Sequence, residues 1–163
     1  MTTSGLLRMT HMETPIGPLR LVGDASGLQQ VSFQVQDAPD PHWKEDSAFF
    51  AAARTQLTRY FGGEAVTFDL PLRPLGTPFQ ERVWEALQTI PYGETVSYGE
   101  IARQLNPPSS PRAVGGANGR NPIAVIIPCH RVIGGTGALV GYTGGLAIKR
   151  ALLALEHPQH RLV

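Results

Sequence analysis

Hydrophobic and polar positions in the first half of the chain predict a small sheet followed by one helix. Three short apolar-rich segments are separated by turns of proline, glycine and aspartate, as in an antiparallel meander: residues 9–12, 19–22 and 28–33. Apolar side chains then recur at helical spacing up to a terminating Gly62-Gly63: Phe50, Ala53, Leu57 and Phe61. Residues 67–70 predict one more short strand, and residues 71–76 predict a linker.

Capping sequences mark the helix starts of the second half. A Thr-Pro-x-Gln sequence at residues 77–80 opens a helix whose apolar face carries five large side chains: Phe79, Val83, Trp84, Leu87 and Ile90. A Ser-x-x-Glu capping box at residues 97–100 starts a short helix that ends near Leu105. A polar turn then leads to a second short helix at residues 111–118. Two short helices joined by a tight turn predict a helix-turn-helix.

A long apolar run rich in β-branched residues, 121–132, predicts a buried strand that ends at Cys129. Residues 132–133 and 139–140, with a glycine-rich turn between them, predict a β-hairpin that would be the wing of a winged helix. A last helix runs from about Leu146 to Glu156 and is expected to bury its leucines: Leu146, Leu152, Leu153 and Leu155.

These elements predict two domains in a chain of 163 residues. An α/β domain at residues 1–76, with a small antiparallel sheet and a helix, would support an α-rich winged helix-turn-helix domain at residues 77–163. Formal charge differs between the halves, at −2 for the first and +3 for the second, which makes the second half the candidate for contact with a polyanion.

Composition narrows the class of protein. The sequence has no signal-peptide core and no run of membrane-spanning length, so we expect a cytoplasmic protein without a membrane partner. One cysteine excludes an internal disulfide, a CxxC redox pair and a cysteine-rich zinc site. His11 and His42 lack cysteine or carboxylate partners at ligand spacing, and we expect no metal.

Cys129 is the candidate nucleophile, although a lone cysteine is more often a small buried hydrophobe. The thiolate is the reactive form, and nearby cations favour it; His130 and Arg131 follow at once. Neighbours on a strand point to opposite faces, so His130 would reach the sulfur only through a chain bend or a bridging water. Glu156 is a candidate to orient His130. A zinc deaminase is excluded because only the Pro-Cys part of its signature is present.

The helix at residues 111–118 is nearly bare of side chains. Each interior glycine costs a helix roughly 1 kcal/mol relative to alanine, and four small residues follow Arg112: Ala113, Gly115, Gly116 and Ala117. Close packing against a neighbouring helix and docking on a nucleic-acid groove explain this equally well. Arg112 at the helix start opposes the helix dipole, which favours a role directed outward.

Several motifs together resemble the methylated-DNA–protein-cysteine methyltransferases, which repair 6-O-alkylguanine. The resemblance is carried by Pro128-Cys129-His130-Arg131-Val132 and its flanks: Arg112–Gly115, Asn121-Pro122, Gly141–Gly145, Lys149 and Glu156. It covers residues from about Phe79 to Glu156, and Pro15–Leu19 extends it to the first domain. It implies a ribonuclease-H-like fold for that domain.

The resemblance implies that Cys129 attacks the alkyl carbon and keeps the group as a thioether, so that each molecule acts once without a cofactor. His130, through a water, and Glu156 would form the relay that takes the thiol proton. Tyr98 would donate a proton toward the guanine ring and press on a phosphate. Two further residues would support the site: Asn121 by holding the turn before the cysteine, and Lys149 by its charge.

The resemblance also implies how alkylated duplex DNA would bind. Arg112 would enter the stack in place of a flipped base, and the bare helix with Ala113, Gly115, Gly116 and Ala117 would lie in the minor groove. Four residues would line the guanine pocket: Val132, Tyr142, Thr143 and Gly144. We expect a monomer, with cooperative binding on DNA and 4-O-alkylthymine as a second lesion left open.

Two other functions stay open. One is a lesion-binding protein that marks alkylated bases without repair, although relatives of that kind replace the cysteine. The other is a cysteine-histidine hydrolase acting on a small substrate, which needs a base close to the sulfur and a third group to orient that base.

Overall fold

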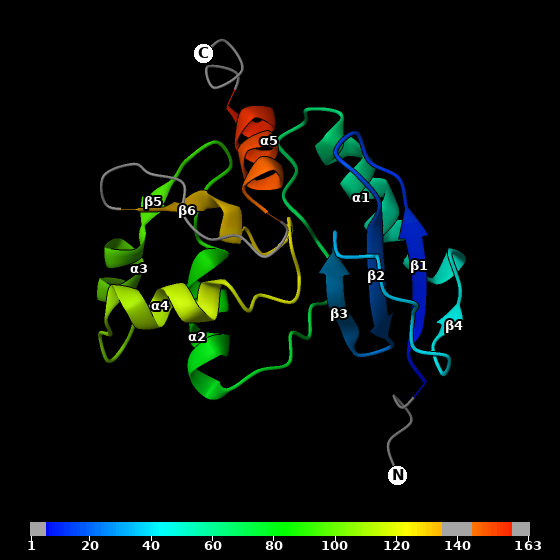
Figure 1. Ribbon diagram of the computed structural model, residues 1–163, viewed down its shortest axis with the longest axis horizontal. Helices are drawn as coiled ribbons and strands as arrows, with labels where there is room; N and C mark the ends of the chain where they lie inside the picture. Colours follow the sequence, from blue (N-terminus) through cyan, green and yellow to red (C-terminus); the bar gives the residue numbers. More distant parts are fainter. Residues whose placement is uncertain (1–5, 135–144, 158–163) are drawn as a thin grey trace. The chain divides into compact units, whose positions relative to one another are not determined.

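The computed structural model describes residues 6–134 and 145–157. Its contacts divide the chain into two compact units, Met1–Leu75 and Gly76–Val163, which are described separately below (Figure 1). Over the described residues, no helix is long and apolar enough to cross a membrane.

The first unit is built on a four-stranded sheet. Its strands are β1 (Arg8–Met12), β2 (Leu19–Asp24), β3 (Gly27–Ser32) and β4 (Lys44–Glu45), in the order β3-β2-β1-β4. β1, β2 and β3 are antiparallel, so the predicted meander is confirmed. The short β4 was not predicted, and it pairs with β1 in parallel, which makes the sheet mixed. β2 is buried along its whole length.

One helix packs on this sheet. A 3-10 turn, η2 (Ala48–Phe50), leads into α1 (Ala51–Phe61), which ends at Gly62. The predicted apolar face is confirmed, since all four of its side chains are at most 9% exposed: Phe50, Ala53, Leu57 and Phe61.

The predicted strand at residues 67–70 is wrong, because a side chain takes the place of a partner strand. Gln56 on α1 accepts from Asp69 N at 2.9 Å and donates to Asp69 O at 3.2 Å. Only Leu72 makes a β-bridge in this part of the described chain, to Leu28.

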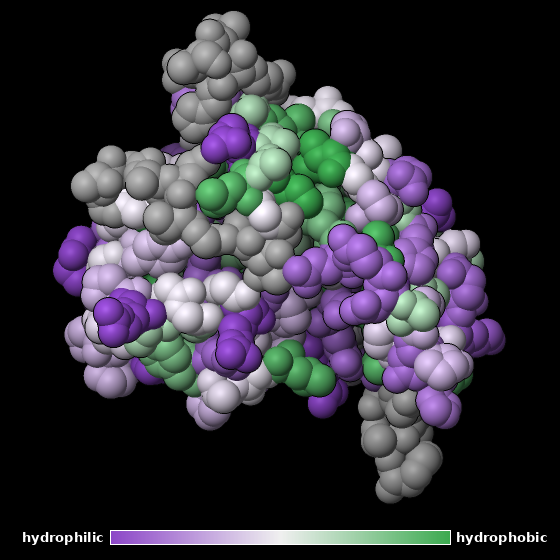
Figure 2. All heavy atoms as spheres, in the orientation of Figure 1, coloured by the Kyte–Doolittle hydropathy of each residue, from purple (hydrophilic) through white to green (hydrophobic). Residues whose placement is uncertain are grey.

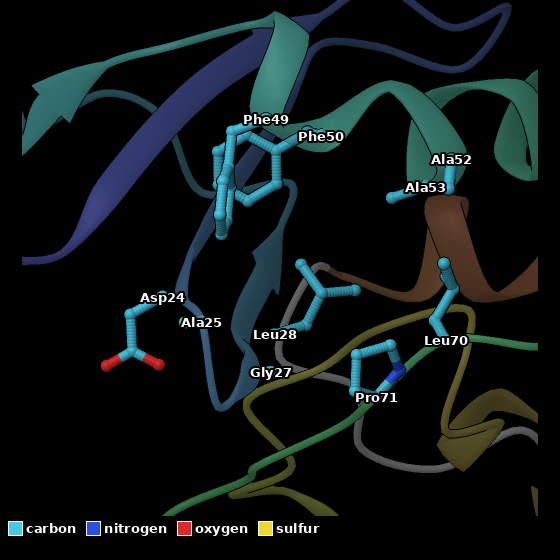
Figure 3. Close-up of a pocket in the computed structure, with 10 residues that line it drawn as sticks. All are labelled: Asp24, Ala25, Gly27, Leu28, Phe49, Phe50, Ala52, Ala53, Leu70 and Pro71. Carbon is cyan, nitrogen blue, oxygen red and sulfur yellow. The ribbon is translucent and has the colours of Figure 1, made fainter. Parts of the chain in front are cut away.

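A hollow of about 260 Å³ opens in the first unit between β3, α1 and the segment after α1 (Figure 3). Its walls are mostly apolar, with Leu28 near the centre and the rings of Phe49 and Phe50 on one side. Asp24 is the only titratable residue among its lining residues, and the carboxylate points away from both rings. Apart from that carboxylate, the lining residues of the hollow offer no nucleophile or general base.

Three helices form the core of the second unit: α2 (Pro78–Leu87), α3 (Tyr98–Gln104) and α4 (Pro111–Asn118). Both predicted capping boxes are present at Thr77 and Ser97, and the helix-turn-helix is confirmed. On α2, Val83, Trp84 and Leu87 are buried as predicted, as is Ile90 beyond its end, whereas Phe79 is only half-buried. Trp84 Nε1 donates to Ala117 O at 2.9 Å and ties α2 to α4.

Two short strands, β5 (Val96–Ser97) and β6 (Val132–Ile133), pair in parallel. The predicted wing joined residues 132–133 to residues 139–140, and the second of these segments lies outside the described residues. Within the described chain, the partner of β6 is therefore β5, the strand directly before α3, and the hairpin stays a prediction.

The last helix, α5 (Leu146–Glu156), has the predicted bounds. Leu152 and Leu153 are buried and Leu155 is half-buried, but the prediction is wrong for Leu146, which is 42% exposed. Leu146 is the first residue of the helix, directly after Gly145 at φ 100°, so it precedes the buried stripe.

Candidate active site around Cys129

Cys129 does not lie on a strand. The segment before it turns twice, with Ile126 N donating to Ala124 O and Cys129 N donating to Ile127 O, both at 2.8 Å. Bonds between residues two apart close γ-turns, and a short 3-10 helix, η3 (Cys129–Arg131), follows. The predicted strand at residues 121–132 is therefore wrong except for its last residue.

The side chain of Asn121 stabilises the two turns before Cys129. Its amide donates to Ile127 O at 2.8 Å and to Ile123 O at 3.3 Å, and it accepts from Ile123 N at 3.0 Å. One side chain thus pairs backbone groups that a strand would pair with a neighbour. The turn also holds Val125 at φ 71°, which for a β-branched residue is a strained conformation.

The chain bend places His130 and Glu156 together in the interior. His130 Nε2 lies 2.6 Å from Glu156 Oε2, and both side chains are at most 1% exposed. The sequence nominated Glu156 to orient His130 but could not place it, because the two residues come from η3 and α5.

Arg131 is a third member of this cluster. It donates to both oxygens of Glu156, at 2.7 and 2.9 Å, and to Ile90 O at 2.8 Å. Its guanidinium also lies 5.7 Å from the centre of the Tyr92 ring. Sequence reasoning counted Arg131 only as a charge beside the cysteine; its burial after a buried histidine is visible only in the fold.

These contacts fix the charges of the cluster. Burial alone would raise the pKa of Glu156, but hydrogen bonds and charges from His130 and Arg131 outweigh it and lower the pKa to about 2. Burial lowers the pKa of His130, against the raising effect of Glu156. We therefore assign an ionised Glu156 and a neutral His130 that donates Nε2–H to it. His130 Nδ1 is then an acceptor, and it is buried without a hydrogen-bond partner among the described residues.

Lys149 and Tyr98 lie near the sulfur. Lys149 is fully buried and donates from Nζ to Val132 O at 2.7 Å. Burial lowers the pKa of Lys149, and the charge of Cys129 raises it. Burial raises the pKa of the half-buried Tyr98, and the same Cys129 charge raises it further. Both groups therefore lie close enough to Cys129, which is only 6% exposed, for a charge on its sulfur to change their ionisation.

Asn118 is a residue that sequence reasoning missed. It lies at the end of α4, is 2% exposed, and donates from Nδ2 to Cys129 O at 3.3 Å. Its side chain also hydrogen-bonds to Tyr98. An asparagine before a glycine is typical of a helix end. Its sequence position therefore gave no sign that its side chain contacts the site.

Apart from Arg112, the exposed face of α4 carries only small, uncharged residues at its centre. Arg112, Ala113 and Gly116 are exposed, whereas Ala117 is buried and does not share their face. In Figure 2 the surface over α4 is pale, between strongly hydrophilic side chains. Close packing accounts for Gly115, where a Cβ would lie 3.8 Å from the Tyr98 ring, whereas a Cβ at Gly116 would meet nothing within 4 Å. Docking on a nucleic-acid groove therefore stays a prediction for the exposed positions of the helix.

Some expected residues cannot be placed. Tyr142, Thr143 and Gly144 lie outside the described residues, whereas Val132 is buried directly after η3. Over the described part of the chain, no group of three or more histidine, cysteine or acidic residues could hold a metal ion. His11 accepts from Arg20, and His42 pairs with Asp40, a carboxylate partner that the sequence analysis had not recognised.

Family models match both units. Residues 7–74 match the model described as 6-O-methylguanine DNA methyltransferase, ribonuclease-like domain, and residues 78–158 match the one described as 6-O-methylguanine DNA methyltransferase, DNA binding domain. The expected ribonuclease-like fold of the first unit is confirmed by the first match.

Relatives and solved structures agree with these matches. A methylated-DNA–protein-cysteine methyltransferase of Methanosarcina acetivorans is 54% identical over 88% of this chain and 94% of its own length. One of Mycobacterium tuberculosis is 54% identical over 93% of each. The crystal structure of Mycobacterium tuberculosis O6-methylguanine methyltransferase has a TM-score of 0.86 at 52% identity, covering 94% of both chains. The Mycobacterium tuberculosis OGT structure in complex with DNA has a TM-score of 0.84 at 52% identity, covering 94% of this chain and 93% of that one.

Proposed function

Because this chain belongs to the methylated-DNA–protein-cysteine methyltransferase family, we propose that it transfers the alkyl group of 6-O-alkylguanine in duplex DNA to Cys129 and that each molecule reacts once. The observation that carries the proposal is the buried array next to the only cysteine, in which neutral His130 and Arg131 both hydrogen-bond to the ionised Glu156.

This array provides an acceptor for the proton of the Cys129 thiol. His130 donates Nε2–H to Glu156, so Nδ1 can accept a proton that leaves Cys129 through a bridging water. The imidazolium that forms is stabilised by the Glu156 carboxylate. A buried Lys149 ammonium near the sulfur favours the thiolate further.

Transfer then proceeds by displacement. The sulfur forms a bond to the alkyl carbon while the bond between that carbon and O6 breaks, and the electron pair goes to guanine. Tyr98 gives a proton toward the guanine ring, which makes the base a neutral leaving group. A thioether has no leaving group for exchange with cellular thiols, so Cys129 stays alkylated and no cofactor regenerates it.

The lesion must leave the base stack to react. Cys129 is 6% exposed, and a carbon inside a duplex cannot reach it. Flipping costs a few kcal/mol and least for a damaged pair. We propose that Arg112, exposed at the start of α4, fills the gap while Ala113 and Gly116 lie in the minor groove. Gly115 packs on Tyr98 beneath them, and Ala117 is not part of this surface.

The flipped guanine would be held beside Val132 and the segment with Tyr142, Thr143 and Gly144. Val132 O already accepts from Lys149 Nζ, so the buried cation would lie close to the guanine held there. Backbone groups suffice to recognise guanine there, so the repair needs no sequence preference. We propose a monomer as the working unit, and 4-O-alkylthymine as a second substrate.

Mass spectrometry of the protein after incubation with a methylated-guanine duplex tests the function. We expect a stoichiometric gain of one methyl group, located on Cys129 by peptide mapping, and no gain for Cys129→Ser. Tight binding without a mass change would support a lesion marker instead. Turnover of a small ester or amide by unmodified protein would support a hydrolase.

A further inference from the structure

Asn118 connects α4 to two residues of the site. Its Nδ2 donates to Cys129 O at 3.3 Å, and its side chain also hydrogen-bonds to Tyr98. A carbonyl oxygen can only accept, so the NH₂ group of the amide must be the end that faces Cys129. The orientation of the Asn118 amide is thereby fixed by the backbone of the nucleophile.

The hydrogen bond to Tyr98 has a definite direction. Burial and the Cys129 charge raise the pKa of Tyr98, whereas the bond from Asn118 lowers it. Asn118 Oδ1 has no hydrogen-bond partner within the described residues, so the amide nitrogen must be the group that faces the phenol, and the phenol oxygen accepts the bond. The two N–H groups of Asn118 therefore go to Cys129 O and to the Tyr98 oxygen, and the phenol keeps its own O–H to donate.

The buried amide oxygen of Asn118 lowers the stability of the fold. Its Oδ1 is buried and has no hydrogen-bond partner within the described residues, and such groups are rare in folded proteins because they lose their water. One turn earlier on α4, a Cβ at Gly115 would lie 3.8 Å from two carbons of the Tyr98 ring. α4 thus contacts Tyr98 at its ring through Gly115 and at its hydroxyl through Asn118.

We propose that Asn118 is a positioning residue for Tyr98: anchored by Cys129 O, its amide aims the phenol at the flipped guanine and stabilises the phenolate left after proton donation. This inference rests on the proposed function, since only there does Tyr98 act on guanine. As the bond between the alkyl carbon and O6 breaks, the proton passes from Tyr98 to the guanine ring and the negative charge moves to the phenolate, which Asn118 N–H then faces.

A double-mutant cycle tests whether Asn118 acts through Tyr98. We expect Asn118→Leu, which keeps the side-chain volume, to slow single-turnover methyl transfer to Cys129 roughly tenfold, the worth of about one hydrogen bond to a charged group. In a Tyr98→Phe background the same substitution should change the rate less than about twofold, because the group it serves is absent. Equal slowing in both backgrounds would overturn the proposal.

Titration of Tyr98 gives a readout that a purely structural role would not move. The phenolate absorbance of each protein, minus that of its Tyr98→Phe counterpart, isolates Tyr98 among the four tyrosines. Asn118→Leu should raise the pKa of Tyr98 by about one unit. Val114→Ala, a fully buried change on the same helix, should lower thermal stability and leave this pKa unchanged. An unshifted Tyr98 pKa in Asn118→Leu would overturn the proposal.

Asn118→Ala serves as the second variant if Asn118→Leu does not fold, and the same two outcomes are expected for it. The unsubstituted protein separates this inference from the function beneath it. If that protein gains no methyl on Cys129, the proposed function fails; if it gains the methyl and Asn118→Ala reacts at the same rate, only the role of Asn118 fails.

Discussion

Glu156 is the residue on which the two cation-forming side chains of η3 converge. His130 uses one of its oxygens and Arg131 uses both, and all of these groups are at most 9% exposed. Buried ion pairs add little to stability relative to apolar packing, but removal of one partner leaves an uncompensated charge. The arrangement therefore makes His130 basicity and local stability depend on the same carboxylate.

The unfolding free energy should therefore change with pH as Glu156 gains or loses its proton. The folded-state pKa of Glu156 is about 2, below its ordinary value of 4.5. The contribution is therefore fully present above about pH 5 and is lost as the pH falls toward 2. It amounts to on the order of 3 kcal/mol. In Glu156→Gln this component should be absent, so its deficit in unfolding free energy should shrink as the pH falls, as measured by urea unfolding.

Glu64→Gln is the matched control for that experiment. Glu64 pairs with Arg59 on the surface, where both side chains are more than half exposed. Exposed pairs contribute about 0–1 kcal/mol, so the unfolding curve of this variant should follow the unsubstituted protein at every pH. A Glu156→Gln deficit that is the same at pH 7 and pH 3 would contradict the assigned ionisation.

Two neighbouring glycines of helix α4 face different surroundings. Gly115 faces the Tyr98 ring, and Gly116 faces open space. The same substitution at the two positions therefore separates packing from DNA contact. Both positions lie in a helix interior, where alanine is more favourable than glycine by roughly 1 kcal/mol.

We expect Gly115→Ala and Gly116→Ala each to raise the unfolding free energy by about 0.5–1 kcal/mol. The added methyl at Gly115 makes an ordinary contact with Tyr98, so duplex affinity should not change. The methyl at Gly116 should weaken duplex binding several-fold if α4 lies in the groove. Fluorescence anisotropy with a labelled duplex measures both. Equal affinities for the two variants would remove α4 from the interface.

The segment at residues 121–131 shows why the nucleophile's surroundings were harder to predict than the helices. Its apolar, β-branched composition favours a strand, but Asn121 satisfies three of its backbone groups from within. A side chain that pairs the backbone over six residues leaves no composition signal. Because of the bend that results, Cys129 and His130 lie on a 3-10 helix and not on a strand.

For the molecule as a whole, the positive charge of the second unit and the exposed Arg112 are the features that duplex DNA would meet. A net charge of +3 is small for a DNA-binding unit, so few phosphates are neutralised and salt should weaken binding only moderately. Recognition would then depend on the flipped base and on the residue that replaces it in the stack.

Arg112→Ala should therefore slow repair of a methylated duplex by tenfold or more and leave reaction with the free base analogue within twofold. The physical reason is that only the duplex requires a filled gap after flipping. Single-turnover rates on the two substrates measure the difference. Arg54→Ala, which removes an exposed charge from the first unit, should change neither rate. Equal losses on both substrates for Arg112→Ala would remove that residue from the flipping role.

The helices and the candidate nucleophile could be predicted from the sequence, because both depend on residues close together in the chain. The capping boxes at Thr77 and Ser97 act over three residues, and Cys129, His130 and Arg131 are consecutive. Three other features depend on the fold: the contacts of Glu156 with His130 and Arg131, the pairing of β6 with β5, and the hydrogen bonds of Asn118 to Tyr98 and Cys129. These contacts join residues 11 to 36 positions apart. Chain folding, and no local preference, brings such groups within hydrogen-bond distance.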